Sequence, residues 1–137
     1  MKITYTKEIL ELMGLFARAT GADVKDCFEH DGVLYFVVAE GNIGKAVGKG
    51  GQTVKDLQDR LNKKIRVLEF HSNLVEFIKN IIYPLKADTI EENNGVVVLR
   101  STDRSTRAIL IGRNAKNLNR VKDAAKRYFQ VEDIKVE

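Results

Sequence analysis

The feature that most constrains the fold is an internal repeat, because the same pattern of elements occurs twice along 137 residues. An offset of 64 positions brings glycine, basic and hydrophobic positions into register: Gly48 with Gly112, Lys49 with Arg113, Val54 with Leu118 and Leu57 with Val121. Self-similarity at a fixed period indicates a duplicated structural unit. The repeat predicts two α+β domains, residues 1–71 and 72–137, each a three-stranded sheet with helices packed on one face.

Each copy predicts the same order of elements: helix, two strands, short helix, glycine loop, helix and strand. In the first copy, Thr6 and Gly21 bound an amphipathic helix, and Asp31-Gly32 predicts a tight turn between two strands. The expected elements of the first copy are strands 24–30 and 33–39, a short helix 42–47, a loop 48–51, a helix ending near Asn62 and a strand from residue 64. Those of the second are a helix 74–82 ended by Pro84, strands 88–92 and 96–100, a helix 105–110, a loop 111–115, a helix through Phe129 and a strand 134–136.

The net charge of +4 conceals a strongly uneven distribution of charge. Residues 42–66 carry +5 and residues 100–127 carry +7, so the other 84 residues carry −8. Both basic segments contain a glycine loop and occupy equivalent places in the repeat. Basic residues clustered in this way produce an electrostatic field that attracts a polyanion. The alternative is that each segment is an ordinary solvated helix face.

The loop chemistry favours contact with a sugar-phosphate backbone. Small residues in the stretch GKGG (48–51) let the chain approach a phosphate, and the following helix presents unpaired N–H groups. A nucleotide-hydrolysing loop is not supported, because the Gly44–Gly48 spacing is one residue short and Gly50 supplies no hydroxyl for magnesium. A dinucleotide fingerprint also fails, since Thr53 replaces its last glycine. A plain turn between two helices is the remaining alternative.

Other function classes find little support. Cys27 is the single cysteine, His30 and His71 are far apart, and no pattern predicts a metal site or a cofactor. Asp56 and Asp59 lie three apart on a helix, but no third group converges on them, so we expect no enzyme activity. Seven aromatic residues are expected in the core and not as platforms for stacked bases: Tyr5, Phe16, Phe28, Tyr35, Phe36, Phe77 and Phe129. Apolar runs fall short of a membrane span and no signal segment is evident, so we expect a soluble, monomeric, cytoplasmic protein.

The stretch AVGKGGQTVKDL (46–57) resembles the core motif of KH domains: an aliphatic residue, G-x-x-G, and aliphatic residues three and six positions further on. The helix and strand before it resemble the N-terminal extension of type II KH domains. Two such domains in succession are similar to the short archaeal NusA-like proteins of the transcription termination and antitermination family. The stretch 44–70, followed by LVEFIKNIIYP (74–84), carries most of this likeness.

The resemblance implies a factor that binds single-stranded RNA and acts with RNA polymerase. The residues expected to bind RNA lie in and beside the two loops: Lys45, Val47, Gly48, Lys49, Gly50, Gly51, Lys55, Arg107, Gly112, Arg113, Asn114 and Lys116. Two other roles remain open: a module whose basic faces dock on acidic surfaces of polymerase or ribosomal proteins, and a ribosome-associated KH factor.

The second loop departs from the motif, because Ala115 stands where the last glycine belongs. A methyl group there is expected to restrict the backbone and weaken the phosphate clamp. Glycine at this position is expected to cost up to about 1 kcal/mol of helix propensity. We also expect the two repeats to pack as one unit, since each alone buries little surface.

Overall fold

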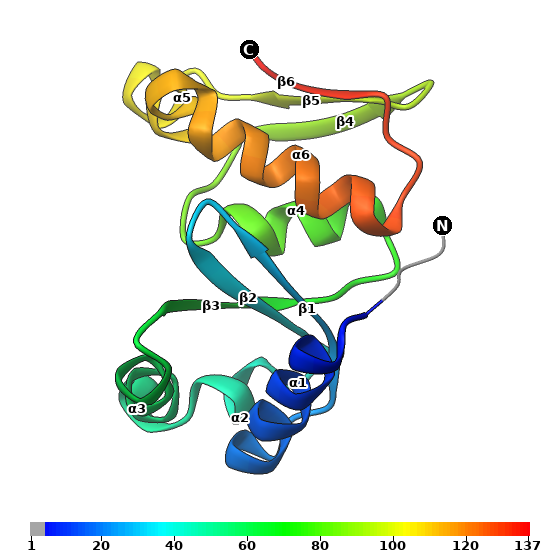
Figure 1. The fold of residues 1–137 in the computed structure, drawn as a ribbon. Coiled ribbons are helices and arrows are strands. Elements are labelled where there is room, and N and C mark those ends of the chain that lie inside the picture. The colour runs from blue at the N-terminus through cyan, green and yellow to red at the C-terminus, as the bar shows by residue number, and fades with distance from the viewer. Residues whose placement is uncertain (1–4) are drawn as a thin grey trace. The chain divides into compact units, whose positions relative to one another are not determined.

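The computed structural model describes residues 5–137, apart from the side chain of Lys49, and has the expected α+β fold (Figure 1). Two compact units are present, one ending at His71 and one running from Ser72 to Glu137. Each unit contains one three-stranded sheet, and its helices cover one face of that sheet (Figure 1).

The two units have the same order of elements, as the repeat predicts. The first unit contains α1 (Lys7–Thr20), β1 (Val24–His30), β2 (Val33–Val38), α2 (Ile43–Val47), the 3-10 turn η1 (Lys49–Gly51), α3 (Gln52–Leu61) and β3 (Lys64–Glu69). The second contains α4 (Leu74–Ile82), β4 (Thr89–Asn93), β5 (Val96–Arg100), α5 (Arg104–Ile111), the 3-10 turn η2 (Arg113–Ala115), α6 (Lys116–Tyr128) and β6 (Asp133–Val136).

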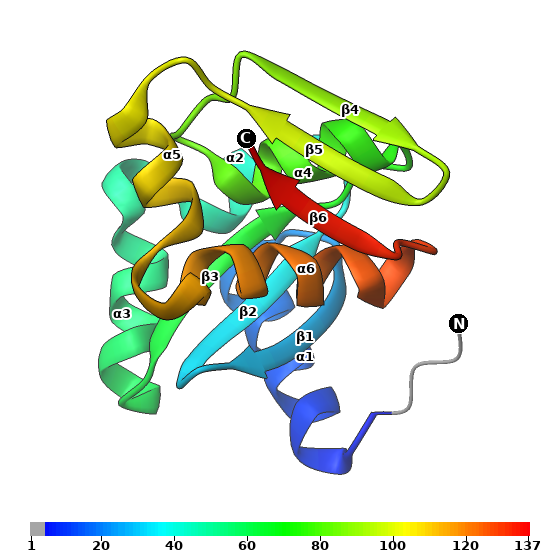
Figure 2. The same cartoon turned by 90° about the horizontal axis from the view of Figure 1, so that it is seen from above.

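Both sheets combine an antiparallel hairpin with a parallel third strand. Strand β2 lies between β1 and β3, and its parallel register with β3 begins with Val33 opposite Lys64. Strand β5 lies between β4 and β6 in the same way, with Val96 opposite Asp133 (Figure 2). Parallel neighbours require a crossover connection. Each crossover here is a helix, a glycine loop and a second helix, so the fold places the loop between two helices.

Local signals in the sequence explain where several elements begin and end. The backbone N–H of Ile9 donates to Thr6 Oγ1 at 3.2 Å, and Gly21 ends α1 in the left-handed conformation. The predicted hairpin turn at Asp31-Gly32 has φ of +53° and +78°, both positive as this tight turn requires. These predictions of the helix cap and the turn are confirmed.

Aromatic residues form part of each core. In the first unit, Phe16 of α1 stacks on Phe36 of β2 with ring centroids 4.1 Å apart, and both are 1% exposed or less. In the second unit, Phe77 of α4 is fully buried and contacts the rings of Tyr128 and Phe129. These ring contacts fix α1 to the sheet of the first unit and α4 to the end of α6 in the second.

The two loops have matching backbone conformations at their first glycine. Gly48 has φ +73° and ψ −174°, and Gly112 has φ +75° and ψ 172°. This region is essentially restricted to glycine. A Cβ at Gly48 would lie 2.7 Å from Thr53 Oγ1, so close packing also excludes a side chain there.

The last loop position also matches, although its residue differs. Gly51 has φ +74° and ψ 15°, and Ala115 has φ +59° and ψ 23°. Ala115 adopts the left-handed conformation of its glycine counterpart, so alanine at this position keeps the loop shape. Ala115 also precedes the first residue of α6, so glycine at this position loses no helix propensity.

We predict that Ala115→Gly raises the free energy of unfolding by about 1 kcal/mol. The left-handed region costs an L-residue roughly 1–2 kcal/mol, and glycine removes this cost. Glycine also raises the conformational entropy of the unfolded chain, which offsets part of the stabilisation. Urea denaturation followed by circular dichroism measures the change.

Gly51→Ala is the matched control. A Cβ at Gly51 would have nothing within 4 Å, so the alanine costs only backbone conformational energy. The free energy of unfolding should therefore fall by about as much as it rises in Ala115→Gly. A destabilised Ala115→Gly variant would contradict this account of the loop.

Candidate nucleic-acid interface

Each loop leads directly into the start of the longer helix of its crossover. The N-cap residues Gly51 of α3 and Ala115 of α6 provide no side-chain hydrogen bond. The first N–H groups of an α-helix lack partners within the helix and carry partial positive charge. Both loops therefore present backbone donors that suit an anion.

A residue beneath each loop fixes its position, and sequence reasoning missed both. Thr53 lies under Gly48, and Asn117 lies under Gly112, where an added Cβ would come within 2.8 Å of its amide. Asn117 Nδ2 also donates to the Ile109 carbonyl at 2.7 Å, which ties α6 to the end of α5. Thr53 and Asn117 are separated by the repeat offset of 64, and this equivalence is the signal that identifies them.

The predicted RNA-binding residues of the first unit gather around one loop. Lys45 is exposed on α2, Val47 is half-buried at its end, and Lys55 is exposed on α3. Gly50 is exposed at the middle of the loop, and a Cβ there would meet nothing within 4 Å. The side chain of Lys49 lies outside the described part of the chain.

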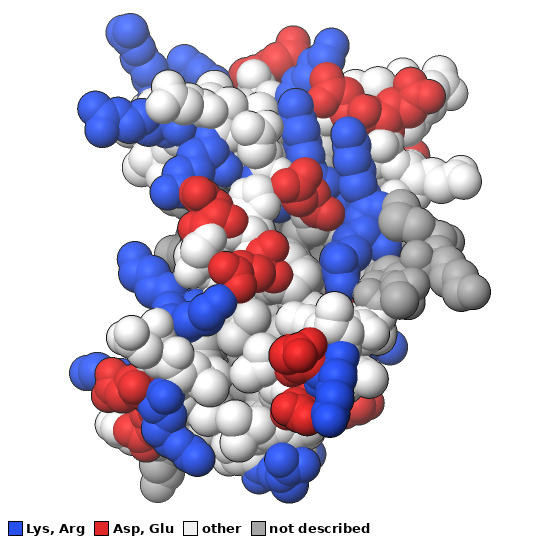
Figure 3. Space-filling view, in the orientation of Figure 1, with Lys and Arg blue, Asp and Glu red and all other residues white. Residues whose placement is uncertain are grey.

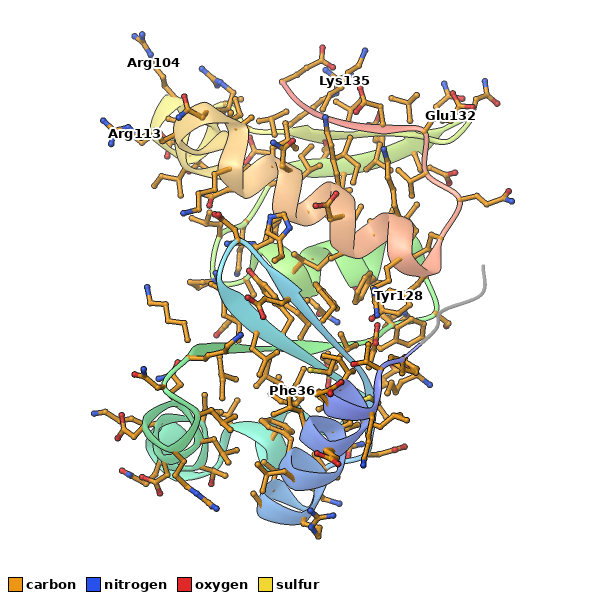
Figure 4. All side chains as sticks on the ribbon, viewed as in Figure 1. Phe36, Arg104, Arg113, Tyr128, Glu132 and Lys135 are labelled. Carbon is orange, nitrogen blue, oxygen red and sulfur yellow. The ribbon has the colours of Figure 1, made fainter. Side chains whose placement is uncertain are left out.

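The second unit brings most of its predicted residues to the other loop. Arg113, Asn114 and Lys116 are exposed, and Figure 4 shows Arg113 extending away from the ribbon. Arg107 has a different environment, because it is half-buried and its Nη1 donates to the Ser101 carbonyl at 2.6 Å. This bond anchors α5 to the segment after β5, so Arg107 has a structural contact that its sequence position did not reveal.

Some basic residues of the crossovers are paired with a carboxylate and others are not. Lys63 pairs with Glu29 at 2.6 Å, and Lys122 pairs with Asp133 at 3.0 Å. By contrast, the side chains of several basic residues of the crossovers make no ion pair or hydrogen bond with any described residue: Lys45, Lys55, Arg60, Arg104, Arg113 and Arg120. Figure 3 shows Lys and Arg side chains gathered over the end of the second unit that carries α5 and its loop. Unpaired cations are available to an external anion.

Two carboxyl groups, Asp103 and Asp133, have pKa values below their ordinary range. The Lys122 ammonium lowers the pKa of Asp133, and a hydrogen bond from the Thr106 hydroxyl at 2.6 Å lowers that of Asp103. Both groups are therefore ionised at neutral pH. Asp56, one of the two helix carboxylates considered above, accepts a hydrogen bond from Gln52 Nε2 at 2.7 Å.

Metal-ligand clusters and helices of membrane-spanning length are both absent from the part of the chain that the structure describes. Within residues 5–137, no group of three or more His, Cys, Asp or Glu side chains could hold a metal ion. None of the helices that the structure describes combines the length and the apolar character needed to cross a bilayer.

Comparison with known proteins finds relatives along nearly the whole chain. The chain is 41% identical over 140 residues to a "Probable transcription termination protein NusA" of Methanococcus vannielii, covering 99% of this chain and 80% of that protein. It is 30% identical over 138 residues to a protein of the same name from Halococcus morrhuae, covering 99% of each.

The crystal structure of APE1850 matches with a TM-score of 0.81 and 31% sequence identity, covering 97% of this chain and 100% of the other. No protein-family model matches the chain. Identity of 41% over nearly the whole chain nevertheless shows the relationship. The chain belongs to the family of archaeal NusA-like proteins named as probable transcription termination proteins.

Proposed function

We propose that this protein binds single-stranded RNA through its two loops and acts in transcription termination or antitermination with RNA polymerase. The observation that carries the proposal is the shared conformation of the loops, each between two helices and each bordered by unpaired cations. A conformation retained in both copies despite different residues supports a common role for the loops.

The loop geometry suits a sugar-phosphate backbone. Gly50 and Gly51 leave open space where a side chain would stand, so a phosphate can approach their backbone closely. The start of α3 adds N–H donors, and Lys45 and Lys55 add charge on either side. The second loop repeats this arrangement with Arg113 and Lys116.

Single-stranded RNA fits better than a duplex. Half-buried aliphatic side chains, Val47 and Val54 in the first unit, border the loop and offer apolar surface to unpaired bases. Sequence-specific RNA-binding proteins chiefly target unpaired bases, which a duplex hides. KH domains clamp the backbone in this way with a G-x-x-G loop, and the observed order of strands and helices supports assigning both units to the type II form.

The proposed partners follow from the relatives, whose names assign them to transcription termination. Such a factor meets nascent RNA at RNA polymerase, so we propose a cytoplasmic protein that works as a monomer on that complex. The proposed domains are residues 1–71 and 72–137, and the proposed contacts are the twelve residues named in the sequence analysis. Arg107 is the weakest of them, because its guanidinium already binds the Ser101 carbonyl.

The first test places carboxylates in each loop. Lys49→Asp combined with Gly50→Asp removes a cation and adds two anions beside the proposed phosphate, so RNA affinity should fall by at least tenfold, about 1.4 kcal/mol. The equivalent double variant, Arg113→Asp with Asn114→Asp, should cost less, because the Ala115 methyl already limits close approach. Titration of a fluorescent single-stranded RNA measures both affinities.

Circular dichroism provides the control for folding of both double variants. Unchanged RNA affinity in the two folded variants would exclude the loops as the binding site. If polymerase is still bound while RNA of any sequence is not, the protein is instead an interaction module.

A second prediction concerns salt. If three to six phosphates are neutralised, log K should fall against log salt concentration with a slope of roughly −2 to −4, at about −0.7 per phosphate of a single strand. Titrations from low to physiological salt measure this slope. A flat response would show that phosphate contacts do not drive binding.

A third prediction concerns RNA length. Each KH domain holds about four nucleotides, so full affinity should require roughly eight or more consecutive unpaired nucleotides. In the Lys49→Asp, Gly50→Asp variant, affinity should instead level off at about four. Calorimetry with RNAs of increasing length measures the length beyond which affinity no longer rises in each protein. If affinity in the unmodified protein already levels off at the length seen for the variant, only one loop binds RNA.

A further inference from the structure

The two loops share one backbone shape but present different chemical groups at their third position. Gly50 has φ +61° and ψ 21°, and Asn114 has φ +56° and ψ 31°. A Cβ at Gly50 would meet nothing within 4 Å, and Asn114 is exposed. The first loop thus offers bare backbone at a position where the second projects an amide into open space.

The amide of Asn114 has no structural task within its unit. Its side chain makes no hydrogen bond with any residue that the structure describes. Asparagine tolerates the left-handed region better than most residues, so it can carry a polar side chain where glycine is otherwise preferred. The side chain is therefore available to a bound ligand.

The chemistry of the amide indicates which backbone group it recognises. Phosphate oxygens only accept hydrogen bonds, and the neighbouring Arg113 already supplies charge and several donors for them. Asn114 adds a side-chain acceptor, Oδ1, as well as the donor Nδ2. In a sugar-phosphate backbone the ribose 2′-hydroxyl is the group that can donate to this acceptor, and DNA lacks it.

We propose that Asn114 accepts a hydrogen bond from a ribose 2′-hydroxyl and determines the preference of the second loop for RNA over DNA. This inference rests on the RNA-binding function proposed above. The first loop binds the backbone of RNA or DNA without preference, because Gly50 has no side chain that could form a hydrogen bond with the 2′-hydroxyl.

The experiment compares single-stranded RNA and DNA of the same sequence, each about twelve nucleotides long so that both loops can be occupied. The ratio of the two dissociation constants is measured for the unmodified protein and for Asn114→Gly. Glycine adopts the observed φ without strain, so the variant keeps the loop shape. The RNA preference should fall by about three- to tenfold, the range expected for one hydrogen bond.

Gly50→Asn is the reciprocal variant. It places the same amide at the equivalent position of the first loop, where there is room for it, and should increase the RNA preference. RNAs carrying one 2′-deoxy nucleotide at each position in turn locate the contact. The unmodified protein should be sensitive at a position where Asn114→Gly is not.

The outcomes separate this inference from the proposed function. If RNA binds but its preference over DNA is the same in the unmodified protein and Asn114→Gly, Asn114 does not select ribose and the proposed function stands. If the unmodified protein binds neither nucleic acid, the proposed function fails and the inference fails with it.

Discussion

The conformation of the first loop glycine is the constraint on which fold and site both depend. Gly48 and Gly112 lie in a region of φ and ψ that glycine alone occupies readily, with Thr53 and Asn117 packed where a Cβ would stand. This conformation joins the two helices of each crossover and so allows a parallel strand to follow. The same residue therefore sets the chain path that completes the sheet and leads into the helix start at which we propose that an anion binds.

The second feature of the site is its charge, because several basic side chains beside the loops have no carboxylate partner among the described residues. Ion pairs between elements, such as Lys63–Glu29 and Lys122–Asp133, neutralise charge near the strands. The loops keep unpaired basic residues, including Arg113, beside uncapped helix starts. Partial charges from the backbone and full charges from side chains act together there. This combination favours a flexible polyanion, whose backbone can follow the loop and whose bases remain accessible.

Local and periodic signals in the sequence predicted most of the fold. The Thr6 cap, the Asp31-Gly32 turn and the repeat offset each depend on residues close together or regularly spaced, and each was confirmed. Properties that depend on particular tertiary contacts were missed. The left-handed conformation of Ala115 opposes its intrinsic preference, and the bond from Arg107 to the Ser101 carbonyl required the chain to be folded.

The most direct test of the central claim is the NMR response of backbone amides to single-stranded RNA. The account predicts that the largest chemical-shift changes occur in two clusters, residues 48–55 and 112–117, and that both disappear at high salt. Changes confined to the sheets, with both loops unaffected by saturating RNA, would contradict it.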